Sequence, residues 1–279
     1  MARQRLGQHF LADEGWREQI ARAIRVSPHS TGGIGGSDSD YCWIEVGAGH
    51  GEMTEHLLQS GKPVYAVELD TPLVAGLQRM AKQQPSLTVM AGDVLQTDLA
   101  AIAAGRRMRI YGNLPYYITS PILHHFFLYA DQIDIIHIVI QLEVAERLAA
   151  QPGQSDYGYL SVVTQFYSRP DLVLRIPHGA FRPPPEVDSA LVTMRLPGAR
   201  IHLDDIAAEP FLTFVKSCFA QKRKTVANNL KSLAKAEQIR EVLRQLDLRE
   251  DARAEQLTVE VLAKLYQALR AAKLKTNGY

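Results

Sequence analysis

Trp43-Ile44-Glu45-Val46-Gly47-Ala48-Gly49-His50-Gly51 is the stretch that decides the fold of this 279-residue chain. An apolar run, typical of a buried strand, passes directly into glycines at every second position. Glycine lets the backbone approach a ligand closely, and a helical pattern follows at 53–59. The stretch predicts the first strand, turn and helix of a nucleotide-binding α/β unit, although Gly-x-Gly-x-Gly alone is often only a tight turn.

The same alternation of strand and helix continues along the chain. Further strands are predicted at 64–68, 87–90, 108–111, 135–140 and 191–195. Helical periodicity occurs at 72–83, 99–104, 121–129, 143–150 and 159–167. Nearly continuous apolar strands separated by helices are typical of a parallel sheet covered on both faces, with right-handed crossovers. We therefore predict the doubly wound α/β class.

The ends of the chain differ from this central region. Asp13 is a candidate N-cap for a helix near the N-terminus, and the Gly- and Ser-rich residues 27–40 predict a flexible surface loop. Beyond Pro197-Gly198 the apolar residues keep a helical period without strand-like runs. We predict a catalytic domain over 1–200 and a small all-helical domain over 201–279.

Composition limits the class of protein. Hydrophobic residues make up 46% and charged residues 22%, as in ordinary soluble proteins, and no apolar run approaches the roughly 20 residues that span a bilayer. The basic N-terminus is not followed by a signal-like apolar segment, so we expect a cytoplasmic protein without membrane contact. Cys42 and Cys218 lack ligand spacing, which predicts buried thiols and no metal site. No exposed apolar seam is evident, so we expect a monomer.

Positive charge is concentrated near the C-terminus. The formal net charge is −3 over residues 1–200 and +4 over residues 201–279. No acidic residue interrupts the span that contains Lys216, Lys222, Arg223, Lys224, Lys231 and Lys235. Such a field suits a polyanion such as RNA.

Polar residues follow three successive strands at the edge where open α/β sheets bind ligands. Gly47 and Gly49 form the first turn, Glu68 ends the second strand, and Asp93 with Val94 follows the third. Each alone has an ordinary explanation as a tight turn or a solvated cap. Together they predict a site for a ribose and an adenine, without separating NAD from S-adenosylmethionine.

The stretch Gly112-Asn113-Leu114-Pro115-Tyr116-Tyr117-Ile118 predicts the floor of an active site. Pro115 fixes its own φ and keeps Leu114 out of the helical region. The Asn113 side chain and the Leu114 carbonyl can then present two acceptors to one amino group. Tyr116 adds a flat ring on which a nucleobase could stack. The plainer alternative is a strand end whose Asn caps a turn.

Six motifs of the chain together resemble those of a known family. The motifs are Gly7-Gln8-His9-Phe10-Leu11, Glu45 to Gly51, Val67-Glu68-Leu69-Asp70, Gly92-Asp93-Val94, Gly112 to Tyr116, and Phe181-Arg182-Pro183-Pro184-Pro185-Glu186-Val187-Asp188-Ser189. Their order and spacing are similar to those of the small-subunit rRNA adenine N6,N6-dimethyltransferases over nearly the whole chain. The resemblance implies a Rossmann-like class I methyltransferase fold.

The family's activity would be the transfer of two methyl groups to N6 of each of two adjacent adenosines in the 3′-terminal hairpin of small-subunit rRNA. The donor would be S-adenosylmethionine, and the partner a small ribosomal subunit or its pre-30S precursor. The resemblance also implies the cofactor-binding residues: Gln8, His9 and Leu11 at the methionine end, Gly47 and Gly49 beneath it, Glu68 at the ribose, Asp93 with Val94 at the adenine, and Asn113 beside the reacting centre.

The resemblance further implies the residues around the target base. Asn113 and the Leu114 carbonyl would accept hydrogen bonds from the N6 amino group, and Tyr116 with Phe181 would sandwich the flipped base. The alternative interpretation of Phe181 is a core aromatic before a proline-rich turn. His9 departs from the pattern, which usually has Asn there, and this puts cofactor affinity and its pH dependence in doubt. Taken alone, His9 is an ordinary surface histidine.

The cations of 219–230 are predicted to lie on the polar face of a helix. Lys222, Arg223 and Lys224 would contact RNA phosphates, although a solvated helix face is the usual explanation for such a run. Two other functions stay open. Related enzymes dimethylate an adenosine of large-subunit rRNA and confer antibiotic resistance, and related organelle proteins are transcription or assembly factors on the same fold.

Overall fold

The structure is a computed structural model that describes residues 8–25, 40–203 and 206–276. The predicted loop 27–40 and Gly7 of the first motif fall outside these ranges, except for Asp40. The chain divides into two compact units, one formed by Met1–Ala145 and Pro170–Leu196, the other by Glu146–Arg169 and Pro197–Tyr279. Each unit is described by itself.

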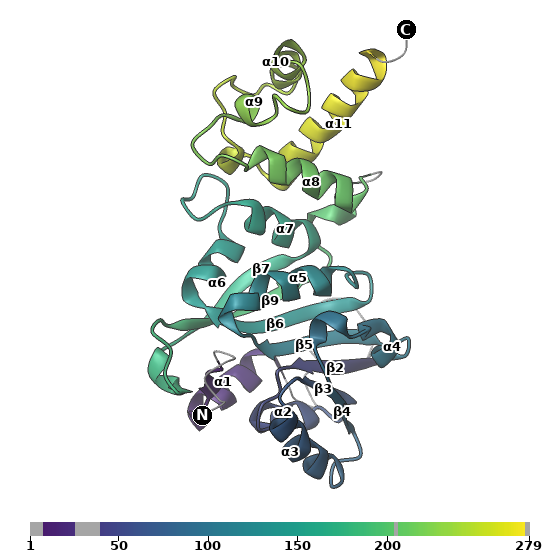
Figure 1. Ribbon diagram of the computed structural model, residues 1–279, viewed down its shortest axis with the longest axis vertical. Helices are drawn as coiled ribbons and strands as arrows, with labels where there is room; N and C mark the ends of the chain where they lie inside the picture. The colour runs from purple at the N-terminus through teal and green to yellow at the C-terminus, as the bar shows by residue number, and fades with distance from the viewer. Residues whose placement is uncertain (1–7, 26–39, 204–205, 277–279) are drawn as a thin grey trace. The chain divides into compact units, whose positions relative to one another are not determined.

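A seven-stranded sheet in the order β4-β3-β2-β5-β6-β9-β7 forms the centre of the first unit (Figure 1). The strands are β2 (Tyr41–Val46), β3 (Val64–Glu68), β4 (Leu87–Ala91), β5 (Arg107–Asn113), β6 (Ile133–Gln141), β7 (Arg169–Ile176) and β9 (Ser189–Arg195). The pairs from β4 through β6 are parallel, and β9 is antiparallel to β6. From β2 the strand order runs through β3 to β4 on one side, and from β5 it runs through β6 on the other side. The carboxyl ends of β2 and β5 therefore form a topological switch point.

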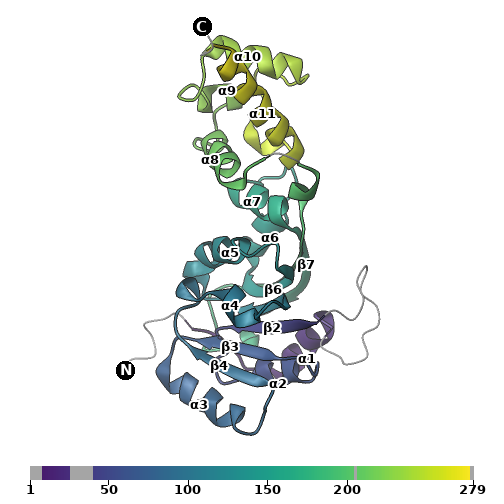
Figure 2. The ribbon, with the colours of Figure 1, turned by 90° about the vertical axis from the view of Figure 1, so that its right-hand side faces the viewer.

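Helices cover both faces of this sheet. They are α1 (Glu14–Ala23), α2 (Glu52–Leu58), α3 (Thr71–Ala81), α4 (Leu99–Ala103) and α5 (Thr119–Phe127), whereas α6 (Leu142–Ala149) runs from this unit into the second. Ile20 of α1, Leu57 of α2 and Leu77 of α3 are buried in one apolar cluster with Trp43 and Tyr111 of the sheet. Figure 2 shows α4 and α5 on the opposite side of the sheet from α2 and α3.

The predicted α/β class is confirmed, and every predicted strand and helix of this region is present with ends shifted by a few residues. Asp13 caps α1 as expected, because its carboxylate accepts a hydrogen bond from the Trp16 amide at 3.0 Å. The expectation of an entirely parallel sheet was wrong, since β9 is antiparallel to β6. The edge strand β7 was also missed, because Pro170 and alternating burial hide it from a search for apolar runs.

A short two-stranded sheet accompanies the central one. β1 (Phe10–Leu11) pairs antiparallel with β8 (Phe181–Arg182), so that Leu11 lies opposite Phe181. The adjacent amides of Ala12 and Asp13 both donate to the Ala180 carbonyl. This pairing attaches the N-terminal segment to the chain that precedes β9.

The second unit is helical. Its helices are α7 (Tyr159–Tyr167), α8 (Ala208–Cys218), α9 (Val226–Asn229), α10 (Ala236–Gln245) and α11 (Val259–Thr276). Residues 146–169 belong to this unit, because Tyr157 donates a hydrogen bond to the Leu257 carbonyl at 2.9 Å and Phe166 packs on Phe211. Cys218 here and Cys42 of the first unit are buried free thiols, as predicted. Among the described helices, none has the length and apolarity to cross a membrane.

The predicted helix through 219–230 is wrong. α8 ends at Cys218, and the residues up to Thr225 form a turn. The Asn229 side chain stabilises that turn, since its amide nitrogen donates to the carbonyls of Cys218 at 2.6 Å and Gln221 at 3.2 Å. Thr225 then caps the short helix α9. The three cations therefore lie on a turn between two helices.

Gly112 lies near the carboxyl end of β5, where the absence of a side chain lets this strand pack closely on β2. A methyl group there would lie 3.1 Å from the Val46 carbonyl oxygen and 2.8 Å from the Leu114 Cδ2 atom. Leu114 is buried and has little room to move away.

Gly112→Ala should lower the free energy of unfolding by about 1–3 kcal/mol, because the added methyl overpacks a closed site. Urea denaturation followed by circular dichroism measures the change. Gly179→Ala is the matched control, because a methyl at Gly179 meets nothing within 4 Å. Equal midpoints for the two variants would contradict the expected overpacking.

Candidate functional site

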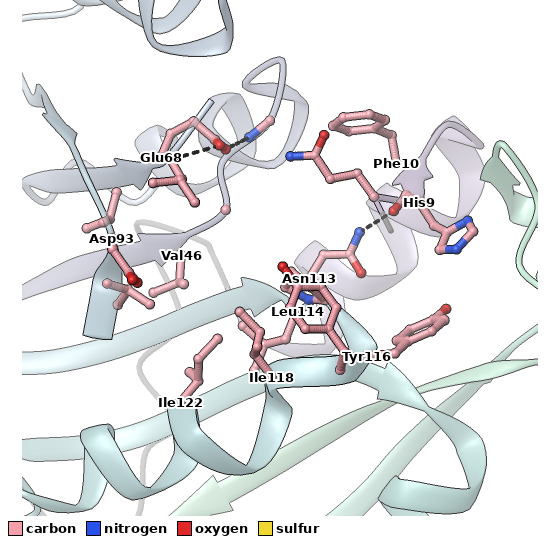
Figure 3. A pocket seen from close by; sticks show the side chains of 18 of the residues that line it. His9, Phe10, Val46, Glu68, Asp93, Asn113, Leu114, Tyr116, Ile118 and Ile122 are labelled. Atoms are coloured by element: carbon pink, nitrogen blue, oxygen red, sulfur yellow. Dashed lines mark hydrogen bonds between the residues drawn. The ribbon is translucent and has the colours of Figure 1, made fainter. Parts of the chain in front are cut away.

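A cavity of about 830 Å³ lies in the first unit at the carboxyl ends of the central strands (Figure 3). Its lining residues are Gln8, His9, Phe10, Val46, Gly47, Gly49, Val67, Glu68, Leu69, Gly92, Asp93, Val94, Asn113, Leu114, Pro115, Tyr116, Tyr117, Ile118 and Ile122. The cavity thus brings together residues predicted at the sheet edge, in the Asn113 turn and in the N-terminal segment.

The Glu68 carboxylate is fixed by main-chain donors. Its Oε2 atom accepts a hydrogen bond from the Gly49 amide, and its Oε1 atom accepts from the Leu69 and Asp70 amides, all at 2.9 Å. Gly49 reaches this position with φ at +60°, a conformation that favours glycine. With about two acceptor sites on each oxygen, Oε1 is fully used and Oε2 keeps one, so Glu68 can still receive a hydroxyl donor from a ligand at Oε2.

Asp93 caps a short helical turn, η2 (Val94–Gln96), at the end of β4. Its Oδ1 atom accepts a hydrogen bond from the Leu95 amide at 2.9 Å. That cap uses one carboxylate oxygen and fixes the direction of the other. The neighbouring Val94 is buried and apolar. The free oxygen of Asp93 is thus an acceptor that lies next to an apolar surface.

Asn113 ends β5 and is held by the N-terminal segment. Its amide nitrogen donates to the His9 carbonyl at 2.9 Å. A carbonyl only accepts, so the nitrogen has to face His9 and the Oδ1 acceptor faces away from it. The Leu114 amide donates to the Val139 carbonyl at 3.0 Å, and Pro115 has a φ of −58°, which stiffens the turn.

Tyr116 is oriented at its hydroxyl and covered on its ring. The hydroxyl is 2.8 Å from the Ser189 Oγ atom at the start of β9, and burial raises the pKa of Tyr116. The imidazole of His9 lies over the ring, with the centroids 5.5 Å apart and the planes at 21° (Figure 3). The Nδ1 atom of His9 is 2.8 Å from the Pro183 carbonyl.

Phe181 and Leu11 are the predicted site residues that the cavity does not include. Phe181 is fully buried and Leu11 nearly so, and both pack in the core with Ile176 and Ala180. The β1–β8 pairing turns both side chains inward. The expectation that the Phe181 ring is available to stack on a base is therefore contradicted by this arrangement.

The three predicted RNA-binding cations belong to the second unit and are exposed. The Lys222 Nζ atom donates to the Ser155 carbonyl at 2.7 Å. Arg223 and Lys224 carry no side-chain hydrogen bond or ion pair within the described chain. These two side chains are free to meet an anion.

Several cavity residues received no individual role in the sequence analysis, although Tyr117, Ile118 and Leu69 lie within its quoted motifs. Tyr117, Ile118 and Ile122 continue from the Asn113 turn into α5, and Leu69 directly follows Glu68. Tyr117 is 63% exposed and Leu69 56% exposed, which is unusual for large apolar side chains. Tyr117, Ile118 and Leu69 could have been predicted from the sequence, because they are neighbours of predicted site residues. Ile122 could not, because it reaches the cavity only as a result of how α5 is oriented.

Glu45 lies in the core at the end of β2, two residues before Gly47. It is 2% exposed, and the Thr54 hydroxyl of α2 donates to its Oε2 atom at 2.5 Å. Burial raises the pKa of Glu45 from its ordinary 4.5 to about 8, against the hydrogen bond from Thr54, and the nearby Glu52 and Glu68 carboxylates raise it further. A protonated carboxyl group therefore fastens α2 beneath the glycine turn at neutral pH.

The doubly wound sheet, with a cavity at its switch point, is the fold of the class I methyltransferases. Two solved structures share the fold: a dimethyladenosine transferase from Plasmodium falciparum (TM-score 0.78, 22% identity, 95% of this chain and 98% of that chain) and the 23S rRNA methyltransferase ErmE (0.67, 24%, 94% and 99%). Residues 1–271 match the family model described as ribosomal RNA adenine dimethylase. The chain belongs to this family.

Curated relatives agree with that family. Ribosomal RNA small subunit methyltransferase A of Acidobacterium capsulatum is 38% identical, over 95% of this chain and 90% of the relative. The protein of the same name from Koribacter versatilis is 35% identical, over 95% and 94%. The protein of that name from Xanthomonas oryzae pv. oryzae is 38% identical, over 92% of both chains.

Glu45→Gln should flatten the dependence of stability on pH. Between pH 4.5 and 8 the folded wild type keeps a proton that the unfolded chain has lost, so this contribution to stability is complete below pH 4.5 and is lost as the pH rises through 8. The loss has a slope of at most about 1.4 kcal/mol per pH unit. Glutamine keeps an acceptor for Thr54 and carries no charge.

Chemical denaturation of both proteins at several pH values between about 5 and 8 measures this difference. The other titrating groups are common to both proteins, so the difference in slope isolates Glu45. Parallel pH profiles would show that Glu45 is ionised in the folded protein.

Proposed function

We propose that this protein transfers methyl groups from S-adenosylmethionine to N6 of two adjacent adenosines in the 3′-terminal hairpin of small-subunit rRNA. The product is N6,N6-dimethyladenosine, formed in the cytoplasm on the small subunit or its precursor by a monomeric enzyme. Family membership and the names of the relatives support this assignment. The observation that carries it is a single cavity that joins Glu68 and Asp93 to the Asn113 turn.

The chemistry of the cavity fits the cofactor. Glu68 offers a fixed acceptor, Oε2, to a ribose hydroxyl, and Asp93 offers an acceptor to an exocyclic amine beside the apolar surface of Val94. Val46, Leu69 and the other apolar residues of the lining suit a flat base. Gln8, His9 and the Gly47 turn would hold the methionine end. When bound, S-adenosylmethionine supplies an electrophilic methyl group on a sulfonium.

Asn113 and Leu114 act on the nucleophile. The lone pair of an adenine amino group is delocalised into the ring, which makes the amine a poor nucleophile. Acceptors placed on its two hydrogens favour the pyramidal form that attacks, and the Asn113 Oδ1 atom and the Leu114 carbonyl would provide them. No strong general base is required, because the proton leaves after the methyl group has transferred. The main contribution of the turn is to position the amine.

Tyr116 holds the flipped base. A target adenine has to leave its stack to reach the cavity, which costs a few kcal/mol, and stacking on an aromatic side chain returns about 1–3 kcal/mol per base. The hydrogen bond between the Tyr116 hydroxyl and Ser189 keeps the ring in one orientation. Because Phe181 is buried, Tyr116 carries most of this stacking in our proposal.

The second unit grips the RNA. Arg223 and Lys224 project from the turn after α8 in a span of the chain without acidic residues. Phosphate contacts from such side chains supply affinity that does not depend on sequence. Lys222 would add to the same field while its amino group also contacts Ser155.

Methyl transfer from labelled cofactor to isolated ribosomal subunits that lack the modification tests the proposal. Label in small-subunit RNA, recovered as N6,N6-dimethyladenosine at the 3′-terminal hairpin, is the expected result. Label in large-subunit RNA would show that the protein is instead a dimethyltransferase of the antibiotic-resistance type. No label in either subunit would indicate a nucleic-acid-binding factor without catalysis.

Asn113→Ala should reduce the rate of methyl transfer by about 100-fold or more, as the loss of one preorganised hydrogen-bonding group commonly does. Cofactor affinity, measured by calorimetry, should stay within about twofold, because Glu68 and Asp93 remain in place. Gln78→Ala, which removes an exposed amide from α3, is the control for the substitution itself. Near-normal turnover of Asn113→Ala would refute the role of its amide.

The double variant Arg223→Ala/Lys224→Ala should bind the rRNA hairpin more weakly, and its affinity should depend less on salt. Each lost phosphate contact reduces the slope of log K against log salt by about 0.7–0.9. Cofactor affinity should not change. Arg79→Ala/Lys82→Ala removes two exposed cations from the end of α3 and serves as the control. If both double variants keep the wild-type slope, the turn does not contact phosphates.

A further inference from the structure

His9 makes three separate contacts at the cavity. Its carbonyl accepts a hydrogen bond from the Asn113 amide at 2.9 Å, its Nδ1 atom is 2.8 Å from the Pro183 carbonyl, and its ring lies on Tyr116. Because a carbonyl only accepts, Nδ1 carries a hydrogen and donates to Pro183. The side chain of His9 is thus fixed at one end by a hydrogen bond and along its face by a ring.

The imidazole lies over the ring of Tyr116. His9, Asn113 and Tyr116 all line the same cavity, and the Asn113 side chain is bonded to the main chain of His9 (Figure 3). Stacked rings lie about 3.5–4 Å apart, so a base that enters between two rings needs a separation of about 7 Å. The 5.5 Å between the centroids of His9 and Tyr116 leaves no room for one.

We propose that His9 is a placeholder for the target adenine: its imidazole occupies the ring face of Tyr116 on which the flipped base stacks, and it moves aside when the base enters. This inference rests on the proposed function. His9 is a positioning and specificity-determining residue in this role, because a ring that stacks on Tyr116 better than imidazole does is required to displace it. A purine, with two fused rings, meets that requirement more readily than a pyrimidine.

The surroundings of His9 permit the movement. His9 precedes β1, whose pairing with β8 begins at Phe10 opposite Arg182. Rotation of the His9 side chain therefore breaks its bond to Pro183 and leaves the strand pairing intact. The carbonyl that holds Asn113 belongs to the main chain, so the acceptor of the Asn113 turn keeps its direction while the imidazole leaves.

The contact depends on the imidazole ring of His9. The family pattern that the first motif resembles has Asn at this position, and an asparagine side chain is shorter and has no ring to lie on Tyr116. His9→Asn thus removes the ring and preserves the main-chain carbonyl. A second wall of the base pocket, or a purely structural histidine, would have the opposite consequence, since its removal would weaken binding of the base.

The test measures the affinity of the full-length protein for the rRNA hairpin with 2-aminopurine in place of the target adenosine. Its fluorescence reports unstacking and restacking of that base without methyl transfer. His9→Asn should bind about 2- to 10-fold more tightly than wild type, the effect expected from losing one competing ring contact. His9→Ala should act in the same direction. His56→Asn, a histidine of α2 outside the cavity, should bind as wild type does.

A double-mutant cycle with Tyr116→Leu isolates the contact between the two rings. In the Tyr116→Leu background, His9→Asn should change the affinity by less than about twofold, because no ring face remains to be uncovered. Unchanged or weaker binding by His9→Asn in an enzyme that methylates small subunits would overturn the placeholder role alone. If the wild-type enzyme labels no small-subunit RNA, the proposed function fails, and the placeholder role fails with it.

Discussion

The parallel pairing of β2 with β5 is the constraint on which the rest of the site depends. Val46 lies opposite Gly112 in this register, so the residues that follow, Gly47 and Asn113, emerge side by side from the sheet. The main-chain hydrogen bonds between β2 and β5 therefore set the spacing between the glycine turn at Gly47 and the turn at Asn113. This spacing does not depend on flexible loops. Chemistry that needs two ligands in contact gains from this arrangement, because the sheet fixes their separation before either one binds.

Buried titratable groups beneath the site are held without charge. A row of paired residues crosses four neighbouring strands. Glu45 of β2 lies opposite Tyr111 of β5, Tyr111 lies opposite His137 of β6, and His137 lies opposite Thr193 of β9. Burial raises the pKa of Glu45 to about 8 and raises that of Tyr111, and burial with the nearby Arg195 and Arg109 lowers the pKa of His137 to about 3. At neutral pH the row is a set of neutral dipoles.

Sequence reasoning located the residues whose chemistry follows from chain order. Gly47, Glu68, Asp93 and Asn113 each come directly after a strand, and parallel strands place such residues at one edge. It failed where side-chain direction depends on tertiary pairing. Phe181 faces the core because β8 pairs with β1, and His9 reaches Tyr116 because the Pro183 carbonyl holds it. The turn at Lys222 to Lys224 was missed for a similar reason, since Asn229 satisfies the carbonyls at the end of α8.

The second unit is assembled from two separate stretches of chain, and this bears on how members of such a family could exchange parts. Residues 146–169 leave the sheet after β6 and return before β7, and Tyr157 within them bonds to Leu257 near the C-terminus. Grafting only the C-terminal stretch onto another member would separate Tyr157 and Phe166 from their partners. Recombination that transfers the second unit intact therefore has to carry both stretches together, so that divergence by many small substitutions is the easier evolutionary route for this architecture.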